Sequence, residues 1–398
     1  MPFAAQASQV SVRGSEILLD GQPFVPNGAS AHDHLTELKA AGANVVRTYG
    51  EEPGEMLDAA QRAGLKVIVG FWMGHPRLGF DYANRAAVSA QLEALRHMVE
   101  RYRYHPALLM WGIGNEVEIE VDPATALQAF AAVGEAAKLV KSLDSAHPTM
   151  AVVAEVGGTK VDDLKRLAPD IDVLGINGYG DGLLTSARRA QAQGWSGPIV
   201  LTEMGALGHW DAPKAPWGAP VEPTSTEKAA QMRRYLTAAR QAKVGALPFL
   251  WGQKQEVTPT WYSLLLPTGE WTETVEAMAE TWGGTPPGRT NHAPRILSFR
   301  TDRSLSIPAG GELNVALVAT DPDGDPVKVE WLVMAETTVR SVGGDREPVP
   351  PTLPEAVHAP SPTGVRIAGL PPGSYRVFAY VRDGRGAAAT ANLPFEVK

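Results

Sequence analysis

Short apolar runs recur along the first 280 residues, and amphipathic stretches of helical period separate them. The runs are rich in β-branched and aromatic residues and end in polar residues or glycine, which is typical of buried β-strands. Because helical stretches alternate with these strands, the strands are predicted to be parallel. Eight ranges carry the pattern: 23–29, 44–49, 65–72, 107–116, 149–154, 172–177, 198–203 and 246–251.

The stretches between the strands have apolar residues at helical spacing. The clearest cover 33–42, 53–64, 86–103 and 125–143, and the first two end on glycine, as helices commonly do. An open doubly wound sheet has the same alternation, but eight strand–helix units over about 250 residues are the usual size of a TIM barrel. We therefore predict an α/β fold, a (β/α)8 TIM barrel.

A glycine- and proline-rich cluster at 283–294, GGTPPGRTNHAP, ends the helical pattern. Beyond it, short runs alternate apolar and polar residues between turn residues, which is typical of a β-sandwich. The predicted organisation is an N-terminal tail at 1–16, a catalytic barrel at 17–282, a linker at 283–294 and a C-terminal Ig-like β-sandwich at 295–398.

Composition and charge exclude several classes of function. The net charge is −8, which argues against nucleic acid or an anionic membrane surface as a partner, since both need basic surface. No run reaches the roughly 18 to 20 apolar residues of a membrane helix, so no membrane insertion is expected. The chain has no cysteine, which excludes thiolate catalysis and Cys-ligated zinc. A signal peptide is not evident at MPFAAQASQ, yet a periplasmic or secreted protein is expected from the alanine-rich start.

Carboxylates stand at the ends of two predicted strands. The fourth run ends in WGIGNEVE, which presents Asn115 and Glu116, and the seventh ends in VLTEMG, which presents Glu203. Catalytic residues of a parallel barrel project from the carboxyl ends of its strands. Cleavage of a glycosidic bond with retention needs two such carboxyl groups, a proton donor and a nucleophile, about 5 to 5.5 Å apart. We predict Glu116 as general acid/base and Glu203 as nucleophile.

With these residues in place, the sequence over 17–283 resembles glycoside hydrolase clan A, whose barrels carry Asn-Glu at the fourth strand and a nucleophilic Glu at the seventh. The resemblance extends to families 2 and 5 through EILLDGQPFVPNG and the NE motif, and slightly to the family 72 β-glucanosyltransferases through VRTYG. It implies a substrate-binding set of Arg47, Tyr49, His75, Asn115, Tyr179 and Trp251.

Within that set, the resemblance implies that Arg47 and Tyr179 donate hydrogen bonds to Glu203 and that Asn115 bonds the sugar 2-hydroxyl. Trp251 would offer a flat face to a sugar ring. The sequence departs from family 2 in lacking the two β domains that normally precede the barrel, which argues against a galactosidase or glucuronidase.

Several other polar and aromatic residues have two readings. His75 is either a site residue or a structural histidine, and His32 and Asp33 either line the pocket or begin a helix. DPDGDP at 321–326 fits a hairpin turn better than a calcium loop, so no metal and no cofactor is expected. Three further glutamates are expected to be surface charges, and four tryptophans either stack on sugars or pack internally: Glu118, Glu120, Glu155; Trp72, Trp210, Trp217, Trp261.

The expected function is a retaining glycosidase of a β-linked poly- or oligosaccharide, a β-glucan first, acting by double displacement. Two alternatives stay open: a transglycosidase that uses the same glutamates, and a non-catalytic carbohydrate-binding barrel. Hydrolase and transferase pass through one glycosyl-enzyme and differ in whether water or a sugar hydroxyl attacks it. The sequence indicates no oligomeric state.

Overall fold

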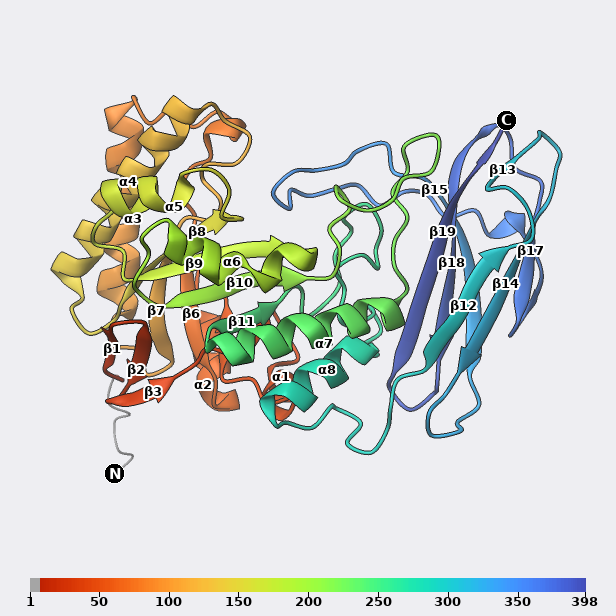
Figure 1. Cartoon of the computed structure of the whole chain (residues 1–398), viewed down its shortest axis with the longest axis horizontal. Coiled ribbons are helices and arrows are strands. Elements are labelled where there is room, and N and C mark those ends of the chain that lie inside the picture. The colour runs from red at the N-terminus through yellow and green to blue at the C-terminus, as the bar shows by residue number, and fades with distance from the viewer. Residues whose placement is uncertain (1–7) are drawn as a thin grey trace. The chain divides into compact units, whose positions relative to one another are not determined.

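The computed structural model describes residues 8–398, which form two compact units. The first unit holds the described residues up to Met204 together with Thr237–Phe249, and the second holds Gly205–Leu236 and Leu250–Lys398. Figure 1 shows the chain coloured along its sequence, and each unit is described below by itself. No helix in the described part of the chain is long and apolar enough to cross a membrane.

The first unit is built on an eight-stranded sheet whose strands pair in sequence order, as predicted. Neighbouring strands pair in parallel, and the last strand returns to the first through a parallel bridge between Asn27 and Ala246. The sheet therefore closes into a barrel. Its strands are β4 (Gly28–Ser30), β5 (Val45–Arg47), β6 (Lys66–Phe71), β7 (Leu108–Ile113), β8 (Thr149–Ala154), β9 (Val173–Tyr179), β10 (Ile199–Gly205) and β11 (Gly245–Pro248).

Helices follow the barrel strands, and local sequence sets where they begin and end. Asn84 caps α3 by accepting the amide of Ala87 at 3.2 Å, and Asp122 caps α4 through two amides. Gly64 ends α2 with a φ of 71°, a left-handed conformation that glycine adopts without strain. The helices of this unit are α1 (Leu35–Ala40), α2 (Gly54–Ala63), α3 (Arg85–Tyr102), α4 (Pro123–Leu143), α5 (Lys160–Leu167) and α6 (Ser186–Ala192), with 3-10 turns η1 (Pro76–Leu78) and η2 (Gly180–Leu184).

A small antiparallel sheet precedes the barrel: β1 (Val10–Arg13), β2 (Glu16–Leu19) and β3 (Gln22–Phe24). The single strand predicted at 23–29 is divided between β3 and β4, because Val25 and Pro26 interrupt the pairing. The predicted tail at 1–16 contains β1, and residues 1–7 lie outside the described residues. Val10 and Ile17 are buried in one apolar cluster with side chains of the barrel strands, so this sheet covers one end of the barrel core.

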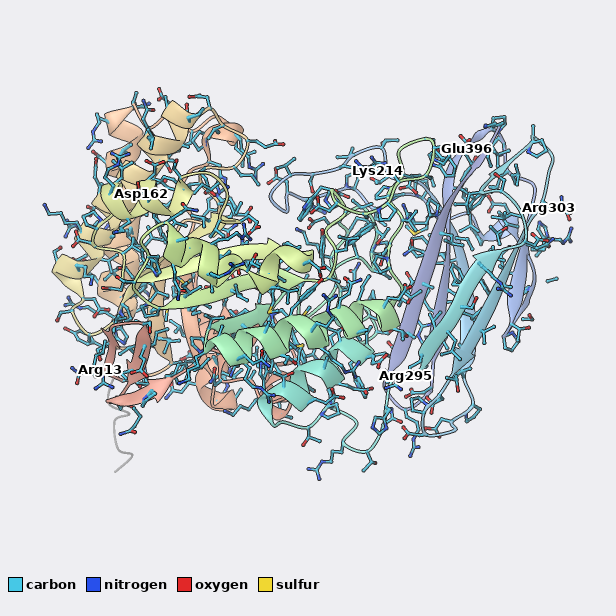
Figure 2. All side chains as sticks on the ribbon, viewed as in Figure 1. Arg13, Asp162, Lys214, Arg295, Arg303 and Glu396 are labelled. Atoms are coloured by element: carbon cyan, nitrogen blue, oxygen red, sulfur yellow. The ribbon has the colours of Figure 1, made fainter. Side chains whose placement is uncertain are left out.

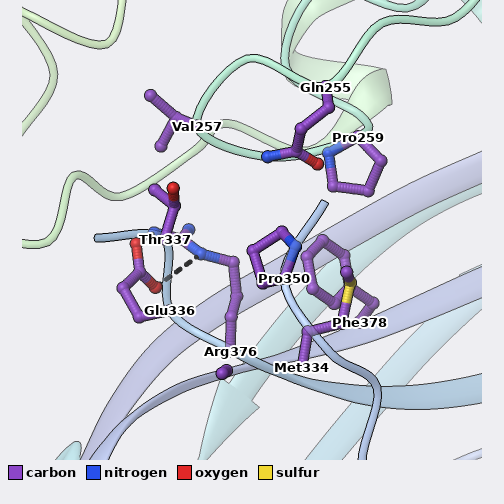
Figure 3. Close-up of a pocket in the computed structure, with 10 residues that line it drawn as sticks. Gln255, Val257, Pro259, Met334, Glu336, Thr337, Pro350, Arg376 and Phe378 are labelled. Carbon is purple, nitrogen blue, oxygen red and sulfur yellow. Dashed lines mark hydrogen bonds and ion pairs between the residues drawn. The ribbon is translucent and has the colours of Figure 1, made fainter. Parts of the chain in front are cut away.

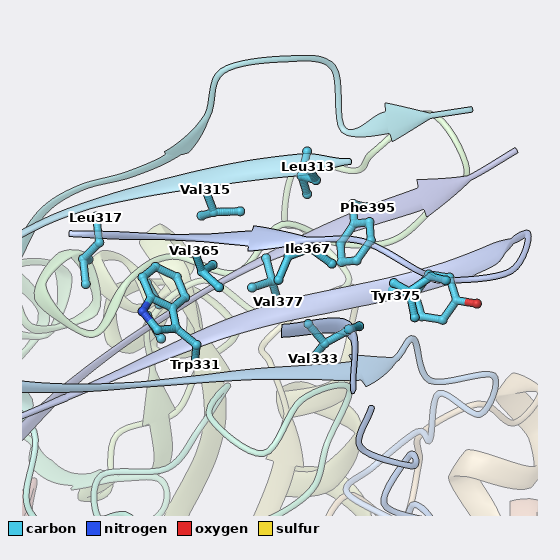
Figure 4. Packing of buried hydrophobic residues seen from close by; sticks show 14 of the residues in the cluster. Leu313, Val315, Leu317, Trp331, Val333, Val365, Ile367, Tyr375, Val377 and Phe395 are labelled. Atoms are coloured by element: carbon cyan, nitrogen blue, oxygen red, sulfur yellow. The ribbon is translucent and has the colours of Figure 1, made fainter. Parts of the chain in front are cut away.

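The second unit contains two four-stranded sheets with an apolar core between them (Figure 4). The sheet orders are β12-β14-β17-β16 and β13-β19-β18-β15. Along β14 burial alternates, with Leu313, Val315 and Leu317 inside, as expected for a strand with one face on a core. The strands are β12 (Arg295–Thr301), β13 (Ser306–Ile307), β14 (Leu313–Thr320), β15 (Lys328–Ala335), β16 (Val357–Ser361), β17 (Gly364–Ile367), β18 (Gly373–Arg382) and β19 (Ala388–Val397), with a 3-10 turn η3 (Pro354–Ala356).

The same unit includes the segments that follow β10 and β11, the start of α7 (Ser225–Ala242), and α8 (Glu273–Trp282). The backbone of Trp271 bonds Gly386 and Ala388, next to β19. Arg295, labelled in Figure 2, begins β12 and lies 3.0 Å from Glu273 of α8. The two sheets are therefore joined to these segments by backbone and ion-pair contacts on both sides of the predicted linker.

A buried polar network adds to this joint. Glu222 pairs with Lys228 and accepts hydrogen bonds from Thr258 at 2.5 Å, Thr260 at 2.9 Å and the amide of Asn392 on β19 at 2.6 Å. Because both charges are buried, they need these partners to offset the loss of hydration.

Beside this network lies a small pocket in which Arg376 pairs with Glu336 at 2.8 Å (Figure 3). The amide of Gln255 is buried at its wall, next to Val257, which has a φ of 60°. That conformation is strained for a β-branched residue. Neither predicted catalytic glutamate lines this pocket.

Candidate active site

Glu203 lies near the end of β10 and is paired with Arg47, the last residue of β5. Arg47 Nη1 donates to Glu203 Oε1 at 3.2 Å and to the carbonyl of Thr202 at 3.1 Å. Both side chains are buried, so the ion pair is poorly screened by water. Arg47 thereby holds the carboxylate of Glu203 in position.

Two tyrosine hydroxyls complete the surroundings of Glu203. Tyr49 donates to its Oε1 at 2.9 Å, and Tyr179, at the end of β9, donates to its Oε2 at 3.0 Å. Burial and the charge of Glu203 raise the pKa of Tyr49 well above its usual value, which keeps the hydroxyl a donor. Hydrogen bonds to both oxygens orient the carboxylate of Glu203, as a nucleophile requires.

Glu116 is connected to Glu203 through two asparagines and Arg47. Asn177 Nδ2 donates to Glu116 Oε1 at 2.8 Å and to Asn115 Oδ1 at 3.0 Å, and Arg47 Nη2 donates to that same Oδ1 at 2.6 Å. Two donors on one oxygen identify it as the amide carbonyl and fix the orientation of Asn115. The Nδ2 of Asn115 is thereby oriented as the donor available to a sugar hydroxyl.

The environment of Glu116 favours its protonated form. Burial first, and then the negative charge of Glu203, raise the pKa of Glu116 from 4.5 to about 8. The hydrogen bond from Asn177 acts in the opposite direction and lowers that pKa. At neutral pH one carboxyl group of the pair is therefore a proton donor, which is what a general acid must be.

The backbone at Glu116 is also unusual. Its φ is 51°, in the left-handed region that non-glycine residues rarely adopt, and its amide bonds the carbonyl of Val152 at 2.9 Å. Such strain persists only where surrounding contacts hold it, and it is concentrated at functional sites. The turn after β7 thus fixes Glu116 where its side chain reaches Asn177.

Other residues predicted for the site are placed differently. His75 is buried and stacks on Trp72, with ring centroids 4.5 Å apart. Trp251 is 1% exposed and belongs to the second unit, so its role as a sugar platform stays a prediction. Of the other tryptophans considered, Trp210 is exposed and Trp261 is buried, with its indole N–H on the carbonyl of Leu207.

The prediction that Glu118 is a surface charge is wrong. The side chain is buried and accepts the amide of Ala154 at 2.9 Å, and Lys160 lies 3.1 Å away. Burial raises its pKa, while Lys160 opposes that rise. Glu120 is exposed and Glu155 is partly exposed and paired with Arg189, as expected for surface carboxylates.

Two residues of this network were not identified from the sequence. Asn177 is the last residue of the predicted strand 172–177, so the rule that selected other strand-end polar residues also applies to it. Ser30 Oγ lies 2.7 Å from the hydroxyl of Tyr49, and no motif in the sequence marks it. Asn177 could have been predicted from its position at a strand end, whereas the contact of Ser30 with Tyr49 is visible only in the folded structure.

Two linked carboxyl groups at strand ends of a parallel barrel, one held by three donors and one favoured as an acid, are the arrangement that glycoside hydrolases use. Residues 10–203 match the family model described as "Glycosyl hydrolases family 2, TIM barrel domain". Over these residues the chain is similar to glycoside hydrolase family 2, within clan A, a family of retaining glycosidases.

Curated relatives agree with this placement over part of the chain. The human β-glucuronidase is 28% identical over 197 residues, 43% of this chain and 27% of that protein. The Chlorocebus aethiops β-glucuronidase is 27% identical over 236 residues, 50% of this chain and 33% of that protein. The matched region therefore spans about a quarter to a third of the length of these relatives.

Solved structures share the fold. The β-D-glucuronidase of Dictyoglomus thermophilum has a TM-score of 0.56 and 20% identity, over 70% of this chain and 54% of that one. A Bacteroides uniformis β-glucuronidase has a TM-score of 0.53 and 14% identity, over 98% of this chain and 48% of that one. At these identities the likeness concerns the fold alone.

Proposed function

We propose that this protein is a retaining β-glycosidase in which Glu203 attacks the anomeric carbon and Glu116 protonates the departing oxygen. The observation that carries the proposal is the hydrogen-bonded path from Glu116 through Asn177, Asn115 and Arg47 to Glu203. It supports two carboxyl groups in one site with different environments, the requirement of double displacement.

The two steps follow from the charges of the pair. While Glu203 is an anion, its charge helps to keep Glu116 protonated. Attack by Glu203 forms a glycosyl ester, transfers the proton of Glu116 to the leaving oxygen and removes the negative charge of Glu203. The pKa of Glu116 is then expected to fall, so Glu116 accepts a proton from water as the ester is hydrolysed.

The substrate proposed first is a β-glucuronide, in place of the β-glucan expected from the sequence. The curated relatives are β-glucuronidases, and neither they nor the family model supports a β-glucan. The argument against a glucuronidase rested on the β domains that precede the barrel in family 2, which is a weaker signal than the match within the barrel. Transfer to a sugar hydroxyl uses the same residues, and product analysis at high substrate concentration separates it from hydrolysis.

Two further proposals concern the rest of the molecule. We propose that the two sheets at 295–398 form an Ig-like sandwich, since they enclose one apolar core. Export to the periplasm or medium is also a proposal, and cell fractionation tests it.

Azide rescue tests the roles of the two glutamates. Glu203→Ala should abolish turnover of an aryl β-glycoside, and azide in the vacated space should restore attack and yield the α-glycosyl azide. Glu116→Ala should still form the glycosyl-enzyme from an activated substrate and yield the β-glycosyl azide. Glu135→Ala is the control, because this glutamate is exposed on α4 and pairs with Arg85. The same anomer from both variants, or near-normal turnover by Glu203→Ala, would contradict the roles.

A further inference from the structure

Trp72 is an exposed tryptophan at the end of a barrel strand. It follows β6 directly and is 38% exposed, although an indole is among the side chains most favourably buried. The other two tryptophans of the first unit, Trp111 and Trp195, are buried, and their indole N–H groups bond Asp144 and the carbonyl of Pro198. Trp111 and Trp195 therefore have a structural role, whereas the exposed ring of Trp72 is available for contact with a ligand.

The indole of Trp72 is held in a fixed orientation. The ring of His75 stacks on it at a centroid distance of 4.5 Å and an angle of 21°. The intervening Gly74 donates its amide to Gln91 of α3 at 2.6 Å, and its carbonyl accepts the hydroxyl of Tyr82 at 2.7 Å. The loop that carries Trp72 is thus tied to the body of the barrel, and its aromatic surface is preorganised.

This surface adjoins the segment that contacts the nucleophile. A side chain on Gly50 would overlap the Cβ of Trp72, so the two residues are packed directly against each other. Gly50 follows Tyr49, whose hydroxyl bonds Glu203. Trp72 therefore packs against the residue that follows Tyr49, and Tyr49 is a hydrogen-bond partner of Glu203.

Polar groups lie on and beside the segment that packs against Trp72. Glu51 accepts the amides of Tyr49 at 3.1 Å and Gly50 at 2.9 Å, and its other oxygen lies 4.0 Å from Nδ1 of His32. Glu51 and His32 are both exposed. An apolar ring face beside such groups suits a sugar, which has C–H groups on its faces and hydroxyls at its edge. The carboxylate of Glu51 repels an acidic ring and accepts hydrogen bonds from a neutral one.

We propose that Trp72 is the platform of a second sugar subsite, next to the reacting sugar, which binds a neutral pyranose ring with hydrogen bonds from its hydroxyls to Glu51 and His32. This inference rests on the proposed function and specifies its substrate class as an oligosaccharide. Because His75 already orders the indole, binding costs little side-chain entropy. The subsite therefore favours longer saccharides over single glycosides, and Glu51 disfavours an acidic sugar ring in the subsite.

The test compares short and extended substrates on the full chain. The substrates are an aryl β-glucuronide, the same compound with a neutral hexose on its non-reducing end, and a β-glucuronide whose leaving group is a neutral disaccharide. Trp72→Ala should lower kcat/KM roughly tenfold on at least one extended substrate and leave the aryl glucuronide within about twofold. Trp72→Phe should recover part of the loss. The extended substrate that is affected shows on which side of the cleaved bond the platform lies.

Tyr104→Ala is the matched control, since Tyr104 is an exposed aromatic residue just after α3, on the loop that enters β7 rather than on one that leaves a strand. It should leave all three values unchanged. An equal loss on short and extended substrates by Trp72→Ala would show a structural role and overturn the proposal, as would no loss on either extended substrate.

A binding measurement separates this inference from the proposed function. Cellotriose and laminaritriose, titrated against the full chain and followed by calorimetry, should bind Trp72→Ala about tenfold more weakly than the unaltered chain. If no glycoside is cleaved but this difference is found, the function fails and the subsite stands. If glycosides are cleaved and Trp72→Ala binds both trisaccharides as the unaltered chain does, the subsite fails and the function stands.

Discussion

At the scale of single residues, the site depends on how the environment of Glu116 differs from that of Glu203. Three donors surround Glu203, whereas Glu116 is buried with Asn177 as its side-chain partner. Predictions at this scale therefore concern protons.

The pH dependence of activity should follow the raised pKa of Glu116. Because the acid must be protonated, kcat/KM is expected to fall as pH rises through about 8. A pKa raised by folding also means that stability present below pH 4.5 is lost progressively as pH rises through about 8. Glu116→Gln, which cannot ionise, should therefore raise the melting temperature more at pH 8 than at pH 4.5. Equal effects at both pH values would contradict the shift.

Asn177 is expected to position Glu116 and to tune its proton affinity. Asn177→Ala removes a hydrogen bond that lowers the pKa of Glu116, so the alkaline limb of the pH profile should move to higher pH. Loss of a hydrogen bond to a charged group, about 1.5–3 kcal/mol, predicts a fall in kcat of roughly 10- to 100-fold. Thr202→Val removes only the bond to Asn177 Oδ1 and should have a smaller effect on both. A lower kcat with an unmoved limb would indicate a purely structural role.

At the scale of helices and strands, the sequence predicted all eight barrel strands because each is a short apolar run with a polar end. Glu116 and Glu203 were found for the same reason. The division between β3 and β4 was missed, since Pro26 lies inside one continuous apolar stretch. The burial of Glu118 was missed because its partner Lys160 is 42 positions away and no local pattern connects them.

Long-range polar contacts are also what the sequence could not show in the second unit. The neighbours Glu222 and Lys228, together with Thr260 and Asn392, come from three segments that the fold alone brings together. Alternating apolar residues predicted the strand β19, and they gave no sign that Asn392 contacts a glutamate 170 positions earlier.

The pair of Glu222 and Lys228 gives a stability prediction. Lys228→Met should lower the free energy of unfolding by about 3–5 kcal/mol, because Glu222 is left buried without its counter-ion. The double variant Glu222→Leu with Lys228→Met should recover much of that loss, since no buried charge remains. Urea denaturation measures both. As a control, Arg85→Ala breaks an exposed ion pair with Glu135 and should cost less than about 1 kcal/mol. Equal losses in the single and double variants would contradict the account.

At the scale of the whole molecule, the second unit takes in residues from both sides of the predicted linker at 283–294. Asn291 in that segment bonds Asp383, and the amide of Ala293 bonds Glu276 of α8. The glycines and prolines that mark the segment in the sequence end a helix, and the side chains around them make buried contacts.

Removal of 283–398 is therefore expected to destabilise what remains of the second unit. Glu222 would lose Asn392, and the backbone of Trp271 would lose Gly386 and Ala388. The shortened chain should aggregate, because apolar surface that faced the two sheets becomes exposed. Size-exclusion chromatography and light scattering measure this. A soluble, monodisperse 1–282 fragment with near-normal turnover would contradict the prediction and support an independent barrel.

The cover that β1 and β2 form over the barrel core has a consequence for protein synthesis. Ile17 is among the first described residues to leave the ribosome, yet Leu247, in the same apolar cluster, is 230 positions later. At about 5–20 residues per second, roughly 10 to 45 seconds separate the two. Throughout that interval the apolar face of this hairpin has no completed barrel to cover, and the nascent chain is a candidate client for chaperones that bind exposed apolar segments.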